Sequence, residues 1–183
     1  MHNYLPLLTP FKRGRSLDHA TWYMGSLMTL LAEKAQTNGA FGFLEYLGKP
    51  GNEPPPHVHE REDELFYILE GEIDSFVGQQ QFNLVAGECI FLPRLVPHGF
   101  RIRSARLRML ILLSPGGFEG YFREMSSPAK KLDMPTEALT YSSADLEQAA
   151  KKCAQYGARF LSADEIVEQL PGFPQQPRAN ALG

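Results

Sequence analysis

Short apolar runs recur at regular intervals through the middle of the chain. They occupy residues 65–69, 73–77, 82–85, 89–92, 100–102 and 107–113. Segments with glycine, proline or several polar residues separate them, and such segments favour turns. Short strands that recur roughly every 8–12 residues are typical of a β-sandwich or barrel, so this rhythm predicts an all-β fold.

The residues before this region allow two interpretations. In the first, residues 26–32 and 40–47 are strands joined by the turn sequence at 33–39. In the second, a helix covers residues 18–35. Residues 1–25 show no sustained period of either kind, and we expect them to form an arm that packs on the core or on a partner subunit.

The character of the chain changes after residue 115. Four apolar residues fall at helical spacing and predict a short amphipathic helix over the barrel: Phe118, Tyr121, Phe122 and Met125. Two helix-start signatures follow, Ser142 with Asp145 and Ser162 with Glu165. The C-terminal part of the chain is therefore predicted to be helical.

A chain of 183 residues, 43% of them hydrophobic, is long enough for one well-filled core. We expect an N-terminal arm at 1–25, a β-barrel domain at 26–115, and a helical extension with its tail at 116–183. The tail from 173 onward is expected to be extended or disordered.

The net charge of −3 argues against nucleic acid or an acidic membrane surface as a partner, because binding phosphates requires clustered cations. The one basic cluster, Arg101, Arg103, Arg106 and Arg108, alternates with apolar residues and is interpreted as a solvated strand face. No apolar run approaches the roughly 18 residues of a membrane helix. With no secretory signal, the chain is expected to be cytoplasmic, and Cys89 and Cys153 to be buried free thiols.

Two histidines and a glutamate stand close together in the β-rich region. His57 and His59 are two residues apart, so in an extended strand both side chains leave the same face. Three prolines at 54–56 form a stiff approach to them. Glu64 follows after a short polar link.

His98 is the candidate for a fourth donor, because it follows a strand and a proline-containing loop in the same region. Three imidazoles and a carboxylate suit one divalent iron, nickel, cobalt, copper, manganese or zinc ion, with room left for water or substrate. His2 and His19 have no partners at ligand spacing and are not assigned to the site.

The spacing around these donors resembles the two signatures of the cupin superfamily. The first consists of Gly51, His57, His59, Glu64 and Gly71, separated by five, one, four and six residues. The second consists of Gly87, Pro93 and His98. The stretch around the histidines is similar in particular to small single-domain relatives of quercetin dioxygenase.

This resemblance implies a double-stranded β-helix, also called a jelly roll, with the metal inside the barrel. It also implies a small-molecule substrate of the flavonol or enediol type, with dioxygen as a second partner. In such relatives the glutamate of the first signature binds the metal and takes the substrate proton. The catalytic role would fall here to Glu64.

The second signature departs from the family at two positions. Leu95 stands where glycine is usual, and Ile102 where asparagine is frequent. Since leucine does not easily hold a positive φ, we expect the turn before His98 to differ from the usual one.

The alternation of side chains along strands supplies substrate-binding candidates. Phe66 and Ile68 share the face of Glu64, and Phe100 shares the face of His98. Tyr46, Phe91 and Met109 are weaker candidates for the same wall. Tyr121 and Phe122 are candidates for a lid.

Three functions are compatible with these residues. The first is a metal-dependent dioxygenase, the second an isomerase of a small sugar-like substrate, and the third a non-catalytic cupin that binds metal or a small molecule. The third predicts a cavity that is too small or fully apolar. We also expect a homodimer.

Overall fold

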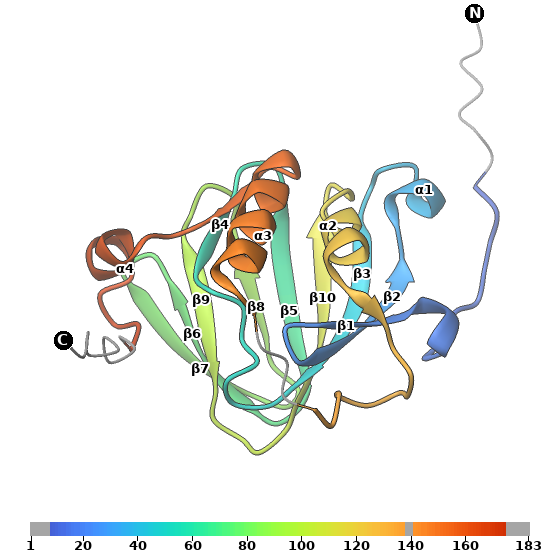
Figure 1. Ribbon diagram of the computed structural model, residues 1–183, viewed down its shortest axis with the longest axis horizontal. Coiled ribbons are helices and arrows are strands. Elements are labelled where there is room, and N and C mark those ends of the chain that lie inside the picture. The colour runs from blue at the N-terminus through green and yellow to red at the C-terminus, as the bar shows by residue number, and fades with distance from the viewer. Residues whose placement is uncertain (1–7, 138–140, 175–183) are drawn as a thin grey trace, which may run out of the picture.

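The computed structural model describes residues 8–137 and 141–174. Within these ranges the strands form two antiparallel sheets that face each other, and the helices lie outside them (Figure 1). His2 and residues 175–183 lie outside the described residues, whereas Phe173, expected to begin an extended or disordered tail, is buried in an apolar cluster.

The larger sheet has the strand order β11-β1-β2-β3-β10-β5-β8. In chain order its strands are β1 (Ala20–Tyr23), β2 (Ser26–Ala32), β3 (Gly42–Gly48), β5 (Asp63–Glu70), β8 (Cys89–Leu92), β10 (Leu107–Ser114) and β11 (Ser127–Pro128). Strand β10 alternates buried and half-buried residues along its length. This period of two places Leu107, Met109, Ile111 and Leu113 in the core between the sheets.

The smaller sheet has the order β12-β4-β9-β6-β7. Its strands are β4 (His57–His59), β6 (Glu72–Val77), β7 (Gln80–Val85), β9 (His98–Ile102) and β12 (Ala158–Phe160). From β4 to β10 the chain crosses repeatedly between the two sheets, which is the winding of a jelly roll. The prediction of an all-β jelly roll with a helical C-terminal extension is confirmed.

The helix alternative for residues 18–35 is wrong. A short 3₁₀ turn, η1 (Leu17–His19), leads into β1, which forms a hairpin with β2 through the left-handed residues Met24 and Gly25. The turn sequence after β2 contains the one-turn helix α1 (Lys34–Thr37) and ends at Asn38 with φ 52°. Part of the expected N-terminal arm is thus a strand of the larger sheet.

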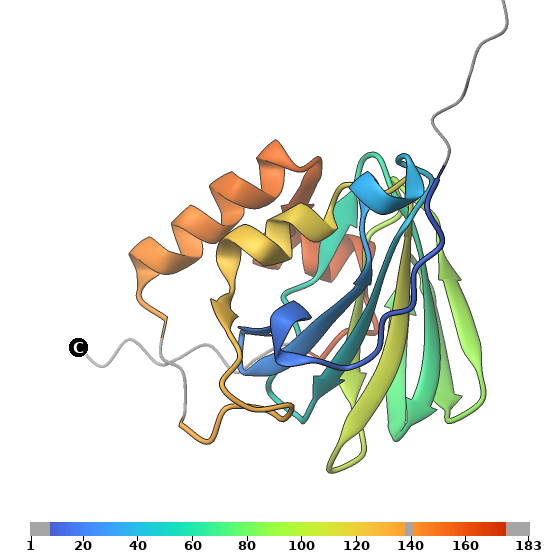
Figure 2. The same cartoon turned by 90° about the vertical axis from the view of Figure 1, so that its right-hand side faces the viewer.

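The helices after the barrel are α2 (Glu119–Met125), α3 (Ser143–Gln155) and α4 (Ala163–Gln169). The side chains of Ser142 and Ser162 accept hydrogen bonds at the starts of α3 and α4, and both capping boxes are complete. Helices α2 and α3 lie side by side against one side of the barrel (Figure 2). Among the described residues no helix is long and apolar enough to cross a membrane.

Strand β12 was missed from the sequence, because its three residues show no period. It brings the chain back from α3 into the smaller sheet and pairs with β4, with Phe160 opposite His57 and Ala158 opposite His59. The C-terminal extension therefore borders the strand that carries two of the predicted metal ligands.

Two expectations about single residues are wrong. Cys89 is exposed, since it begins β8 at the edge of the larger sheet, whereas Cys153 on α3 is buried as expected. Leu95 adopts φ 65°, the left-handed conformation that glycine usually supplies. Its backbone N–H donates to the carbonyl of His59 at 2.7 Å, while its side chain is 67% exposed and meets no steric obstacle in the core.

The arginine cluster, predicted to be a solvated strand face, forms more contacts within the protein than expected. Arg108 donates two hydrogen bonds to the buried carboxylate of Glu45, at 2.9 and 3.0 Å. Arg103 pairs with Asp74, and Arg106 with Asp133. These arginines act in ion pairs across neighbouring segments, although their side chains remain partly exposed.

Candidate metal centre

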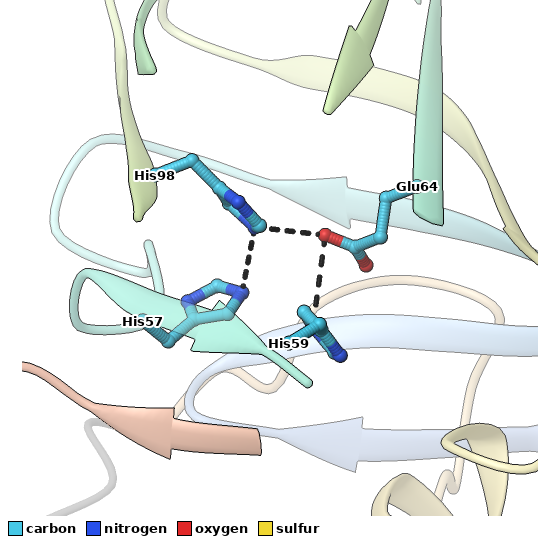
Figure 3. Close-up of side chains that lie close together, drawn as sticks. All are labelled: His57, His59, Glu64 and His98. Atoms are coloured by element: carbon cyan, nitrogen blue, oxygen red, sulfur yellow. Dashed lines mark hydrogen bonds and ion pairs between the residues drawn. The ribbon is translucent and has the colours of Figure 1, made fainter. Parts of the chain in front are cut away.

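The four predicted donors converge inside the barrel (Figure 3). His57 and His59 come from β4 and His98 from the neighbouring β9, where His57 and His98 are direct cross-strand partners. Glu64 comes from β5 of the opposite sheet. One donor atom from each residue lies within 4.8 Å of all the others, and all four residues are buried. The structure thus brings together the set that the sequence singled out.

Each histidine is held by a hydrogen bond on its outer nitrogen. Nδ1 of His57 lies 2.8 Å from the carbonyl of Pro55, and Nδ1 of His98 lies 3.2 Å from the carbonyl of Val96. A carbonyl only accepts, so these Nδ1 atoms carry the proton and leave Nε2 to face the centre. The stiff proline segment therefore orients a ligand through its own backbone.

The centre contains polar atoms that the chain alone does not satisfy. Nε2 of His59 is buried and has no hydrogen-bond partner among the described residues. Nε2 of His57 lies 3.2 Å from Nε2 of His98, which in turn lies 2.9 Å from the Glu64 carboxylate. A cation among these atoms would accept the lone pair of His59 and relieve the repulsion between facing nitrogen lone pairs. The residues therefore fit a metal ion.

The electrostatics of His57 and Glu64 agree with this role. Burial, together with His98 and His59, lowers the pKa of His57 to about 3. Burial alone would raise the pKa of Glu64, but the three histidines lower it to about 2. Burial alone would lower the pKa of His59, but Glu64 and Glu62 raise it. At neutral pH His57 is thus neutral and Glu64 ionised, which are the forms that bind metals.

A cavity of about 40 Å³ lies beside His57 and Glu64. Phe66 and Phe100, two predicted substrate-binding residues, line it, as do Tyr46 and Met109. Ile68, the third, is not in this wall but is fully buried in the core behind it.

Phe91, a weaker candidate for the wall, is 58% exposed and lies outside the cavity. Phe91 is therefore not part of the site.

Helix α2 and strand β12 close the cavity with aromatic rings. The ring of Phe118, just before α2, lies 4.3 Å from that of His59 and edge-on to it. Tyr121 and Phe122, the candidates for a lid, belong to the same wall. Pro54, Phe122 and Phe160 are only half buried, so they form the rim.

Several site residues could not be found from the sequence. Phe118 was assigned only to the apolar face of a helix, and Phe160 carried no signal at all. Glu62, whose carboxylate lies 3.3 Å from Nδ1 of His59, is buried although its neighbours Glu60 and Arg61 are exposed. A hydrophilic run such as residues 60–63 does not show which of its members turns inward.

Comparison with known proteins identifies the family. Residues 46–113 match the family model of the Cupin domain. The chain contains a cupin domain. This cupin is 31% identical over 111 residues to quercetin 2,3-dioxygenase of Bacillus subtilis (strain 168), a match covering 61% of this chain and 33% of that protein. The resemblance to cupins, predicted from the two signatures, is confirmed.

Two further similarities bear on the same domain. The cupin is 30% identical over 94 residues to polyketide synthase CurC of Streptomyces cyaneus, covering 50% of this chain and 60% of that one. It therefore spans less than two thirds of the length of either curated relative. An RmlC-like cupin from Shewanella frigidimarina NCIMB 400 superposes with a TM-score of 0.51 at 20% identity, covering 62% of this chain and 99% of that one. This last similarity supports the fold.

Proposed function

We propose that His57, His59, Glu64 and His98 bind one divalent transition metal, and that the protein is a dioxygenase acting on a small aromatic or enediol compound. The observation that carries the proposal is the convergence of four buried donors beside a cavity with aromatic walls. Similarity to quercetin 2,3-dioxygenase over the cupin domain supports the reaction class. A dioxygenase that cleaves an enediol or catechol places both oxygen atoms in the product and takes all the electrons from the substrate, so it needs no external reductant.

A bound metal of this kind acts as a Lewis acid and allows electron transfer to dioxygen. Glu64 is the residue placed to take the substrate proton, because its carboxylate shares the centre and lines the cavity. With a pKa of about 2 it is a weak base. It therefore suits a hydroxyl that is itself acidic, as in enediols and polyphenols, better than the hydroxyl of a sugar.

The size of the cavity limits what can bind. A volume of about 40 Å³ holds a few water-sized molecules, at roughly 10–15 Å³ each. Dioxygen fits this space, whereas an aromatic ring requires Phe122 and Phe160 at the rim to turn aside. Rotamer changes of this kind are common on binding.

The same volume favours a second candidate, a metal-binding cupin without turnover. A small cavity is one of the two features, with a fully apolar one, that this alternative predicts from the sequence. The alternative differs from the first candidate in having no substrate to oxidise.

Oxygen uptake separates the two candidates. The protein is loaded in turn with iron, nickel, cobalt, manganese and copper, and then given catechol, a small enediol and 3-hydroxyflavone. We expect uptake that equals substrate loss and that falls at least tenfold in Glu64→Gln. If every metal form contains one metal per chain but takes up no oxygen, the dioxygenase proposal is contradicted and metal binding without turnover is the remaining candidate.

A rim variant tests the access of larger substrates. In Phe160→Ala the uptake rate with 3-hydroxyflavone should rise severalfold relative to that with catechol. The matched control is Phe91→Ala, which removes an exposed ring away from the cavity and should leave the ratio unchanged. An unchanged ratio in Phe160→Ala would show that substrates enter elsewhere.

A further inference from the structure

Tyr23 and Tyr121 form a pair of hydroxyl groups in the cavity wall. Tyr23 belongs to β1 and Tyr121 to α2, and both line the cavity. Their hydroxyl oxygens lie 2.8 Å apart, and the two residues are 5% and 1% exposed. Most of the remaining wall, away from the four donors, is apolar.

The pair holds one more proton than its own hydrogen bond uses. Two phenols carry two protons, and the mutual bond consumes one. Neither hydroxyl has another hydrogen-bond partner among the described residues. Burial raises the pKa of both groups, that of Tyr121 to about 12, so both stay protonated at neutral pH. One buried donor is therefore left for a ligand, and leaving such a donor unused is costly.

The third tyrosine of the wall differs in this respect. The hydroxyl of Tyr46 accepts from Ser26 Oγ at 2.9 Å and donates to the carbonyl of Asn52 at 3.2 Å. Its proton is already committed to the protein. Tyr46 thus provides a natural control for the pair.

One aromatic ring separates the pair from the metal ligands. Phe118 contacts His59, with ring centroids 4.3 Å apart, and stacks on Tyr121 at 5.1 Å. The ring of Tyr121 in turn contacts that of Tyr23 at 5.7 Å. A ligand that reaches from the four donors to the pair therefore has an apolar middle about one ring across.

We infer that the Tyr23–Tyr121 pair donates a hydrogen bond to an acceptor oxygen of the substrate. This acceptor lies on the opposite side of the substrate's ring from the two substrate oxygens that are held at the four donors. The substrate class is an enediol or catechol that carries a carbonyl oxygen across its ring. The inference rests on the proposed function, since it concerns the ligand held beside the metal.

Two catechols of nearly the same shape test the pair. 3,4-Dihydroxybenzaldehyde has the carbonyl acceptor, and 4-methylcatechol has a methyl group in its place. Binding of each to the zinc-loaded protein is measured by calorimetry. In Tyr23→Phe/Tyr121→Phe, the preference for the aldehyde should fall about fivefold to tenfold relative to wild type, as expected for one hydrogen bond. Either single variant keeps one hydroxyl with its proton, so the double variant decides.

The Tyr46→Phe variant is the control and should keep the wild-type preference. The double variant should fold, because it keeps both rings and removes both partners of one hydrogen bond. An unchanged preference in the double variant would overturn the inference. A second measurement needs no variant: wild type should bind the aldehyde more tightly than 4-chlorocatechol, which lacks the carbonyl acceptor, and equal affinity overturns the inference as well.

Metal content is recorded on the zinc-loaded samples, and oxygen uptake is recorded on the same protein preparations loaded with iron, nickel, cobalt, manganese or copper. If the protein binds no metal or takes up no oxygen, but wild type prefers the aldehyde and the double variant does not, only the proposed function is contradicted. If metal and uptake are normal but the preference is absent, only the role of the tyrosine pair is contradicted.

Discussion

Nδ1 of His59 lies 3.3 Å from the carboxylate of Glu62, and both residues are almost fully buried. The contact fixes the ring so that its Nε2 atom, which has no hydrogen-bond partner among the described residues and lies 3.7 Å from the Glu64 carboxylate, faces the other donors. A carboxylate behind a histidine ligand orients it and makes it more basic. We therefore expect Glu62 to act as a positioning residue of the candidate metal centre.

Glu62→Gln should weaken metal binding by about 10-fold to 100-fold, because an amide orients the ring less strongly and carries no charge. Affinity is measured by competition with a chelator of known strength. The matched control is Glu60→Gln, which changes an exposed residue two positions away. Equal affinities in the two variants would contradict the positioning role.

Metal binding should stabilise the wild-type fold. At a free metal concentration about 100 times Kd, binding adds about 2.7 kcal/mol to the free energy of unfolding, or about 5–10 °C in Tm. A chelator should reverse the shift. His57→Ala and His98→Ala should lose both the shift and the bound metal, whereas His19→Ala should keep them. One full metal per chain in either of the first two variants would show that the ligands are wrongly assigned.

The two thiols should differ in reactivity. Burial, with a contribution from Glu62, raises the pKa of Cys153 to about 12, whereas Cys89 is exposed. At pH 8 a disulfide reagent should titrate one thiol in the native protein and two after unfolding. Cys89→Ser should abolish the native reaction, and rapid reaction of two native thiols would contradict the burial of Cys153.

The same pKa shift predicts a pH dependence of stability. The folded state holds the Cys153 proton more tightly than the unfolded state does. The contribution of the Cys153 proton to the free energy of unfolding is complete below the ordinary thiol pKa of 9.0. It is lost as the pH rises from there toward about 12. The pH dependence of the unfolding midpoint in Cys153→Ala should be weaker than in wild type over this range.

Leu95→Gly should stabilise the protein by about 1 kcal/mol. Relief of the left-handed conformation contributes about 1–2 kcal/mol, and the greater freedom of glycine in the unfolded chain offsets about 0.5–1 of it. Denaturant unfolding measures the difference. Leu95→Ala removes the same exposed side chain but keeps the strain, so it should have little effect. Equal stability of the glycine and alanine variants would show that the positive φ at residue 95 does not lower the free energy of unfolding.

The local features of this protein could be predicted from its sequence. His57 and His59 share a face because side chains alternate along a strand, and this holds wherever the strand packs. The helix starts at Ser142 and Ser162 were equally predictable, since a capping box needs only four consecutive residues. The spacing of the four donors resembled the two cupin signatures, and the jelly roll was what this resemblance implied.

Tertiary structure decided what surrounds the donors. Phe160 stands opposite His57, although 103 positions separate the two in the sequence, and the hydroxyl of Tyr23 meets that of Tyr121, 98 residues away. Contacts over such distances depend on how the helices dock on the barrel, and no local period encodes them. The sequence by itself therefore determined the four candidate metal donors, whereas the packing of α2 and β12 on the barrel determined the size of the cavity and the hydroxyl pair in its wall.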